Sequence, residues 1–93
     1  MKIHVEIAFS FKRDMDPDDL ALDLPSGSTV RDALFRLAAQ SDPFRHRVFD
    51  EAGVIARHIQ ALVNGVNVQH ARGFDTVLND GDRLTVLPRV GGG

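Results

Sequence analysis

The chain has 93 residues, of which 43% are hydrophobic, and this length suits one small domain with a single core. Its formal net charge is −2, so it lacks the basic surplus that favours nucleic acid or an anionic membrane as a partner. The absence of cysteine excludes a disulfide framework, an iron–sulfur cluster and a thiol nucleophile. No apolar run is long enough to span a membrane, and the N-terminus lacks a signal-peptide core, so we expect a soluble cytoplasmic domain.

The first half of the chain predicts two strands and a helix. Residues 3–11 alternate between large apolar side chains and smaller or polar ones, which is typical of a strand with one apolar face. The acidic, proline-containing stretch 14–19 predicts a loop, and 21–24 predicts a short second strand that pairs with the first. A helix is predicted over 30–40, because its apolar residues recur at i, i+3, i+4, i+7 and i+8. Thr29 is its expected N-cap, with Asp32 as the capping-box partner.

The second half predicts a short helix and a second set of strands. Asp42-Pro43 indicates a helix start with Asp42 as its cap. Asn64-Gly65 lies between β-forming residues and predicts a two-residue hairpin, because both turn positions need a positive φ. Thr76–Leu78 is predicted to form a short helical turn, and 83–88 the last strand. This order of elements predicts an α+β fold, in which one sheet face packs on the main helix and the other is solvated or binds a partner.

The chain ends in three consecutive glycines, Gly91, Gly92 and Gly93, which only Arg89 and Val90 separate from the last predicted strand. The simplest interpretation is a frayed end or an expression scar. The alternative is a delivery arm, because a chain without side chains can thread a narrow channel and present its terminal carboxylate to another protein. The residues by themselves leave both interpretations open.

Three motifs together resemble one known family. The ending Leu87-Pro88-Arg89-Val90-Gly91-Gly92-Gly93, with Val63-Asn64-Gly65 and Asp80-Gly81-Asp82 upstream, is similar to the MoaD/ThiS family of ubiquitin-like sulfur carriers. The resemblance covers the whole chain and implies a β-grasp fold, with a mixed sheet packed on one main helix. It implies a domain over 1–88 and a flexible glycine tail over 89–93. Gly91 departs from the small alanine or serine common at its position, and Arg89 stands where proline is frequent.

The resemblance also implies a mechanism without catalytic side chains. An E1-like, MoeB/ThiF-like enzyme would adenylate the Gly93 carboxylate with ATP, and a sulfur donor would convert the adenylate to a thiocarboxylate. The sulfur would then pass to a biosynthetic acceptor, a synthase subunit in the molybdopterin or cysteine branch of the family. The chain would be a protein cosubstrate, with ATP used by its activating enzyme and no cofactor bound to the chain itself.

Partner docking is expected beside the tail. Leu87 is the best candidate, because it corresponds to the bulky residue before the family's proline. Phe9 and Phe11 could flank it, since the first and last strands pair in this fold, although strand aromatics more often lie in the core. Pro88 is expected to end the strand and begin the tail, and Arg89 to contact an acidic groove or solvent.

The remaining polar residues form no convincing site. His4, His46, His58 and His70 have no metal-ligand spacing, and the acidic loop lacks the glycine and distal glutamate of a calcium-binding EF-hand. We therefore expect no metal. Two alternatives to a sulfur carrier remain: a protein modifier joined through Gly93 to lysine, and a non-covalent β-grasp binding module that does not need its tail.

Overall fold

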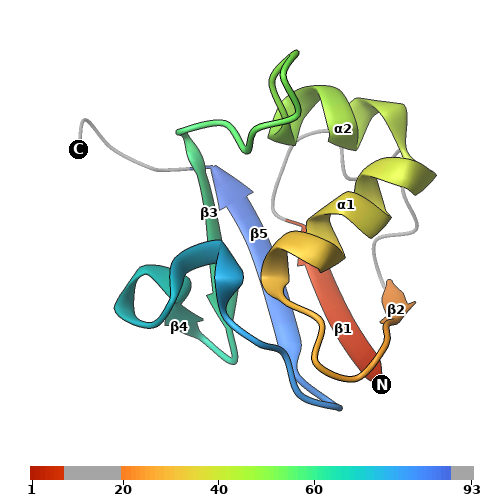
Figure 1. The fold of residues 1–93 in the computed structure, drawn as a ribbon, viewed down its shortest axis with the longest axis vertical. Coiled ribbons are helices and arrows are strands. Elements are labelled where there is room, and N and C mark those ends of the chain that lie inside the picture. The colour runs from red at the N-terminus through yellow and green to blue at the C-terminus, as the bar shows by residue number, and fades with distance from the viewer. Residues whose placement is uncertain (8–19, 89–93) are drawn as a thin grey trace.

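The computed structural model describes residues 1–7 and 20–88 of the chain, and it confirms the β-grasp prediction. Five strands form one sheet with two helices beside it (Figure 1). The elements in chain order are β1 Lys2–Ile7, β2 Ala21–Asp23, α1 Val30–Gln40, α2 Asp42–Val48, β3 Ile59–Val63, β4 Val66–Asn67 and β5 Arg83–Pro88. Two single-turn 3₁₀ helices, Val68–His70 and Gly73–Asp75, lie between β4 and β5.

The strands are arranged in the order β2-β1-β5-β3-β4. The first and last strands run parallel at the centre, with Val5 opposite Leu84 and Ile7 opposite Val86. The other neighbouring pairs, β1 with β2, β3 with β5 and β3 with β4, are antiparallel. The predicted pairing of the first two strands, and that of the first and last, are therefore both confirmed.

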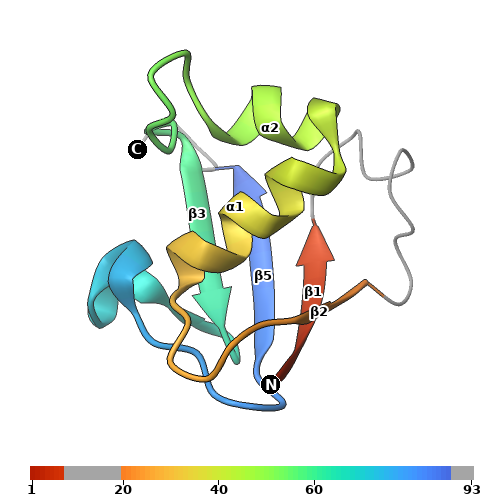
Figure 2. The ribbon, with the colours of Figure 1, turned by 45° about the vertical axis from the view of Figure 1, so that its right-hand side comes forward.

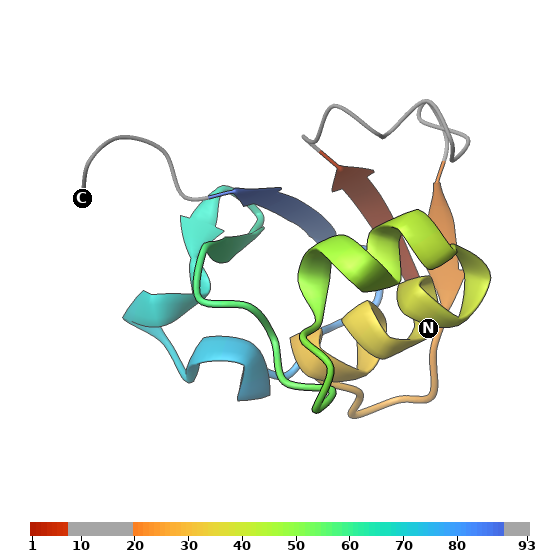
Figure 3. The ribbon, with the colours of Figure 1, turned by 90° about the horizontal axis from the view of Figure 1, so that it is seen from above.

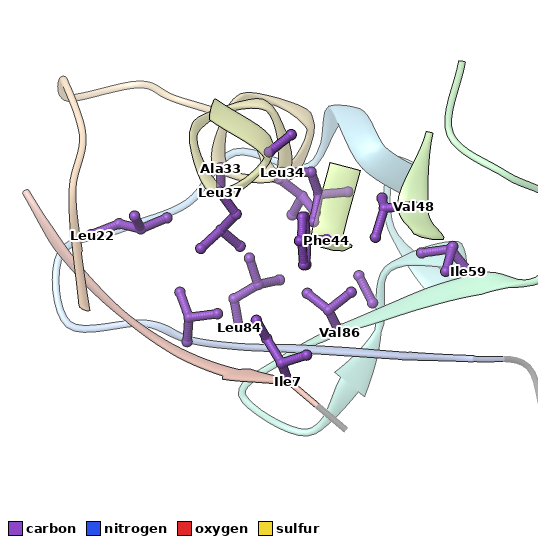
Figure 4. Packing of buried hydrophobic residues seen from close by; sticks show 14 of the residues in the cluster. Ile7, Leu22, Ala33, Leu34, Leu37, Phe44, Val48, Ile59, Leu84 and Val86 are labelled. Atoms are coloured by element: carbon purple, nitrogen blue, oxygen red, sulfur yellow. The ribbon is translucent and has the colours of Figure 1, made fainter. Parts of the chain in front are cut away.

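Both helices lie on the same side of the sheet, as Figure 3 shows from above. Helix α1 crosses this face obliquely in Figure 2, and α2 packs beside it. The core lies between the two layers, where Leu34 and Leu37 of α1 point toward Leu84 and Val86 of β5, with Phe44 of α2 among them (Figure 4). All five of these side chains are fully buried.

Helix α1 matches its prediction from cap to end. Thr29 Oγ1 accepts from the Asp32 N–H at 3.2 Å, and the Asp32 carboxylate accepts from the Thr29 N–H at 2.9 Å. This reciprocal capping box satisfies two amides that have no partner within the helix. The predicted apolar stripe is buried throughout; its members are Val30, Ala33, Leu34, Leu37 and Ala38.

The start of α2 differs from the prediction by one residue. Ser41, not Asp42, is the N-cap, and its hydroxyl accepts from the Phe44 N–H at 3.3 Å. Asp42 lies instead in the first turn, where its carboxylate favours the positive end of the helix and accepts from Arg45 at 3.3 Å.

The predicted helical turn over Thr76–Leu78 is wrong. The nearest helical turn is the second 3₁₀ helix, which lies just upstream at Gly73–Asp75, and Thr76 caps its C-terminal end. Val77 instead forms an isolated antiparallel bridge with Thr29. The extended backbone lets the Val30 N–H donate to Thr76 O and the Leu78 N–H donate to Ser28 O, which joins this segment to the start of α1.

Candidate functional site

The predicted docking residue Leu87 lies on the sheet face opposite the helices. Side chains alternate along a strand, so the burial of Leu84 and Val86 beneath the helices places Thr85 and Leu87 on the other face. Leu87 is partly buried there, although both described helices lie on the far side of the sheet (Figure 3). This placement leaves Leu87 two positions before the first residue of the tail, and its role in partner docking stays a prediction.

A second leucine extends this apolar surface. Gln60 of β3 is directly opposite Leu87, and Leu62 is opposite Thr85, so Leu62 and Leu87 are diagonal neighbours on one face. Leu62 is half-buried like Leu87. No local sequence pattern identifies Leu62, because its position beside Leu87 is set by the register of β3 against β5. We call Leu62, Thr85 and Leu87 the docking face.

The end of the same sheet face that lies near the start of β5 carries charged side chains. Arg83 Nη1 lies 3.7 Å from Glu6 Oε2, and both side chains are more than half exposed. His4 is opposite Arg83 in the register, one strand away. An exposed pair of this kind contributes little stability. The sheet face opposite the helices therefore has a charged end at the Glu6–Arg83 pair, near the start of β5, and an apolar end at Leu62 and Leu87, near the start of the tail.

Pro88 ends β5 at a position where a proline fits. The Asn64 N–H donates to Arg83 O, which makes 64 and 83 a hydrogen-bonded pair of the β3–β5 ladder. Because such pairs alternate, the pair of Ile59 with Pro88 is a non-hydrogen-bonded one. The missing N–H of Pro88 therefore costs no bond to β3, and Pro88 is the last described residue of the strand.

The remaining predicted site residues lie outside the described part of the chain. They are Phe9 and Phe11 in the first strand prediction, and Arg89, Val90, Gly91, Gly92 and Gly93 in the tail. The described part of β1 ends at Ile7, opposite Val86 and one step before Leu87 on the neighbouring strand.

Within residues 1–7 and 20–88 no group of three or more histidine, aspartate or glutamate side chains is placed to hold a metal ion. The four histidines are scattered: His4 is on β1, His46 on α2, His58 just before β3 and His70 in the first 3₁₀ helix. In the same part of the chain, no helix has the length and apolar character needed to cross a membrane.

Comparison with known proteins agrees with this geometry. The model of the ThiS family matches residues 9–93, which include the tail. Small archaeal modifier protein 3 of Haloferax volcanii is 30% identical over 93 residues, and the match covers all of both chains. The sulfur carrier protein CysO of Mycobacterium tuberculosis is 33% identical over 70 residues, which are 73% of this chain and 75% of CysO.

A solved structure supports the same assignment at the level of the fold. The crystal structure of SAMP1 from Haloferax volcanii superposes with a TM-score of 0.83 at 25% identity, and the match covers 100% of both chains. The chain therefore belongs to the ThiS family, as a non-catalytic, ubiquitin-like protein of the sulfur carrier and small archaeal modifier group.

Proposed function

We propose that this chain carries sulfur as a thiocarboxylate on Gly93 for a biosynthetic acceptor, of the molybdopterin or cysteine type. The observation that carries the proposal is the position of the triglycine end, which begins three residues after β5, a strand whose Leu87 lies on the sheet face opposite the described helices. An activating enzyme can bind the docking face while the tail enters the active site of that enzyme. The last three residues of the tail have no side chains, so they fit a narrow channel.

The proposed chemistry takes place entirely at the chain terminus. The Gly93 carboxylate attacks the α-phosphorus of ATP in the E1-like, MoeB/ThiF-like enzyme, which gives an acyl-adenylate and pyrophosphate. Sulfide or an equivalent sulfur donor then attacks the carbonyl carbon and expels AMP, which leaves a thiocarboxylate. Activation is required because an ionised carboxylate is a poor electrophile, and AMP is a good leaving group. We place this ATP-dependent cycle in the cytoplasm.

The docking face explains why the carrier needs a folded domain. An apolar pair beside the tail gives a partner a desolvated anchor, and the Glu6–Arg83 pair at the other end gives it a polar rim. The same face would serve both the activating enzyme and the acceptor subunit, one after the other. Phe9 and Phe11 remain proposed contributors to this contact.

A truncated chain tests the proposal. A variant that ends at Gly91 keeps all of β5 and the docking face, so it should still bind the activating enzyme but form no thiocarboxylate. The matched control is a chain extended by one alanine, which keeps the diglycine but displaces the reactive carboxylate from it. Thiocarboxylate formation by the truncated chain at the normal rate would refute the proposal.

A second candidate function is attachment to other proteins. It is favoured by the match to small archaeal modifier protein 3 over the whole chain. Activation of Gly93 would be the same, and a lysine amine would replace sulfide as the nucleophile, which releases AMP and forms an isopeptide bond. Higher-mass adducts in cell extract that disappear when Gly93 is deleted would support this role; their absence would leave the sulfur carrier.

A further inference from the structure

A pair of stacked aromatic rings lies on the helical side of the molecule, away from the docking face. Phe35 of α1 stacks on Phe49 with ring centroids 4.7 Å apart and an interplanar angle of 20°. Phe49 is 8% exposed, but Phe35 is 48% exposed although it is a large aromatic residue. The proposed sulfur-carrier role assigns no contact to this aromatic pair, and an exposed aromatic ring of this kind is a common feature of protein interfaces.

Phe35 separates two hollows. One hollow, of about 450 Å³, is lined by Leu24, Pro25, Ser28, Asp32, Phe35, Arg36 and Ala39. The other, of about 170 Å³, is lined by Phe35, Ala38, Arg45, Phe49, Asp50, Glu51 and Gly53. Phe35 is the one residue that both share, so its ring forms the ridge between them. The surface is therefore a raised apolar centre with a concavity on each side.

Two charges of opposite sign lie unpaired on the two sides of this ridge. Arg36 lines the first hollow and Glu51 the second, and neither side chain forms a hydrogen bond or ion pair with any residue in 1–7 or 20–88. The other charged groups of the two hollows have partners. Asp32 accepts from the Thr29 amide, Arg45 pairs with Asp42, and Asp50 accepts from two amides of its own turn.

This arrangement is complementary to itself. A two-fold axis through the Phe35 ridge places the first hollow of one copy over the second hollow of the other. Arg36 of each copy then meets Glu51 of its mate, twice in one contact, and the two exposed rings pack at the axis. A site for a strongly acidic or basic partner would instead present one sign of charge.

We propose that the Phe35 ridge is a weak homodimer contact, held by the Phe35 rings and two Arg36–Glu51 ion pairs between copies. Because the contact lies on the helical side, it leaves the docking face of both copies free, so the dimer presents two carrier tails at once. A patch built from one helix and one turn is small, which places this dimer among transient interfaces.

Sedimentation velocity on the full chain tests the proposal, over concentrations up to about 1 mM at low salt, because ion pairs of this kind are screened by salt. We expect a monomer–dimer equilibrium that shifts toward monomer as salt increases. Phe35→Ser, Arg36→Glu and Glu51→Arg should each weaken the dimer about tenfold or more. The matched controls, Val66→Ser and Arg72→Glu, change an exposed apolar and an exposed basic residue elsewhere and should leave it unchanged.

Mixing the two charge variants provides the sharpest test. Arg36→Glu and Glu51→Arg should each be monomeric alone, yet a one-to-one mixture should form a heterodimer, because both contacts then join opposite charges. The double variant should also recover self-association. A wild-type chain that stays monomeric throughout, a dimer insensitive to Phe35→Ser, or a mixture that stays monomeric would each overturn the proposal. Circular dichroism on every variant separates loss of contact from loss of fold.

Discussion

Asn64 stabilises the fold through both its backbone and its side chain. Its φ of 52° is the left-handed value that the hairpin requires, and its side chain donates to Asp82 at 2.9 Å and accepts from the Arg83 N–H at 3.0 Å. We predict that Asn64→Ala lowers the free energy of unfolding by about 1–2 kcal/mol, measured by chemical denaturation. Asn64→Gly relieves the φ strain but loses the side-chain hydrogen bonds, so its free energy of unfolding should lie between those of the unsubstituted chain and Asn64→Ala.

Asn79 provides the matched control, because its exposed side chain has no partner among the described residues. Asn79→Ala should change the stability by less than about 0.5 kcal/mol. Equal losses in the free energy of unfolding for Asn64→Ala and Asn79→Ala would show that the hydrogen bonds of the Asn64 side chain to Asp82 and Arg83 do not stabilise the fold.

A substitution at Leu87 can test partner docking without loss of the fold. It is half-buried on the sheet face away from the core, so Leu87→Ser should keep the fold. We predict that it slows thiocarboxylate formation by about tenfold or more at subsaturating carrier, because an apolar anchor of the partner contact is lost. Val66→Ser removes a 58% exposed side chain from another edge and should leave the rate unchanged. An unchanged rate for Leu87→Ser would refute the docking face.

Helix α1 begins at the capping box that Thr29 and Asp32 form. Thr29→Ala removes the hydroxyl that accepts from the Asp32 N–H. We expect a loss of about 1 kcal/mol, and a fall in melting temperature of about 4–8 °C for a domain of this size. Gln40→Ala, at the exposed C-terminal end of the same helix, should have almost no effect. A melting temperature unaffected by Thr29→Ala would contradict the role assigned to the cap.

The sequence predicted those elements whose signals are local. The 3.6-residue apolar stripe with its cap identified α1, and Asn64-Gly65 identified the hairpin, because a positive φ restricts the residues allowed there. The segment 76–78 was misassigned, because its conformation depends on a bridge to Thr29, 48 positions away by residue number. Leu62 was missed for the same reason: its place beside Leu87 is set by strand register, which no local pattern encodes.

The stability of the whole molecule depends on one small core. The same substitution, Phe→Ala, should therefore cost far more stability at a buried position than at an exposed one. Phe44 is fully buried between the layers (Figure 4), as its place among the core side chains shows. Phe35, in contrast, is 48% exposed. We predict that Phe44→Ala lowers the free energy of unfolding by about 3–5 kcal/mol, a large fraction of the stability of a domain this small. Phe35→Ala should lose no more than about 1.5 kcal/mol, from its stack on Phe49. If Phe44→Ala and Phe35→Ala lose comparable stability in thermal or chemical denaturation, Phe44 does not lie in a core between the helices and the sheet.

We propose above all that the β-grasp domain presents Gly93 for activation. Intact mass spectrometry can detect this activation on a chain confirmed to end at Gly93 and incubated with ATP, sulfide and an E1-like adenylating enzyme. We predict a mass increase equal to the replacement of one oxygen by sulfur, localised to the C-terminal peptide and absent without ATP. An unchanged mass with several such enzymes would refute the sulfur-carrier proposal.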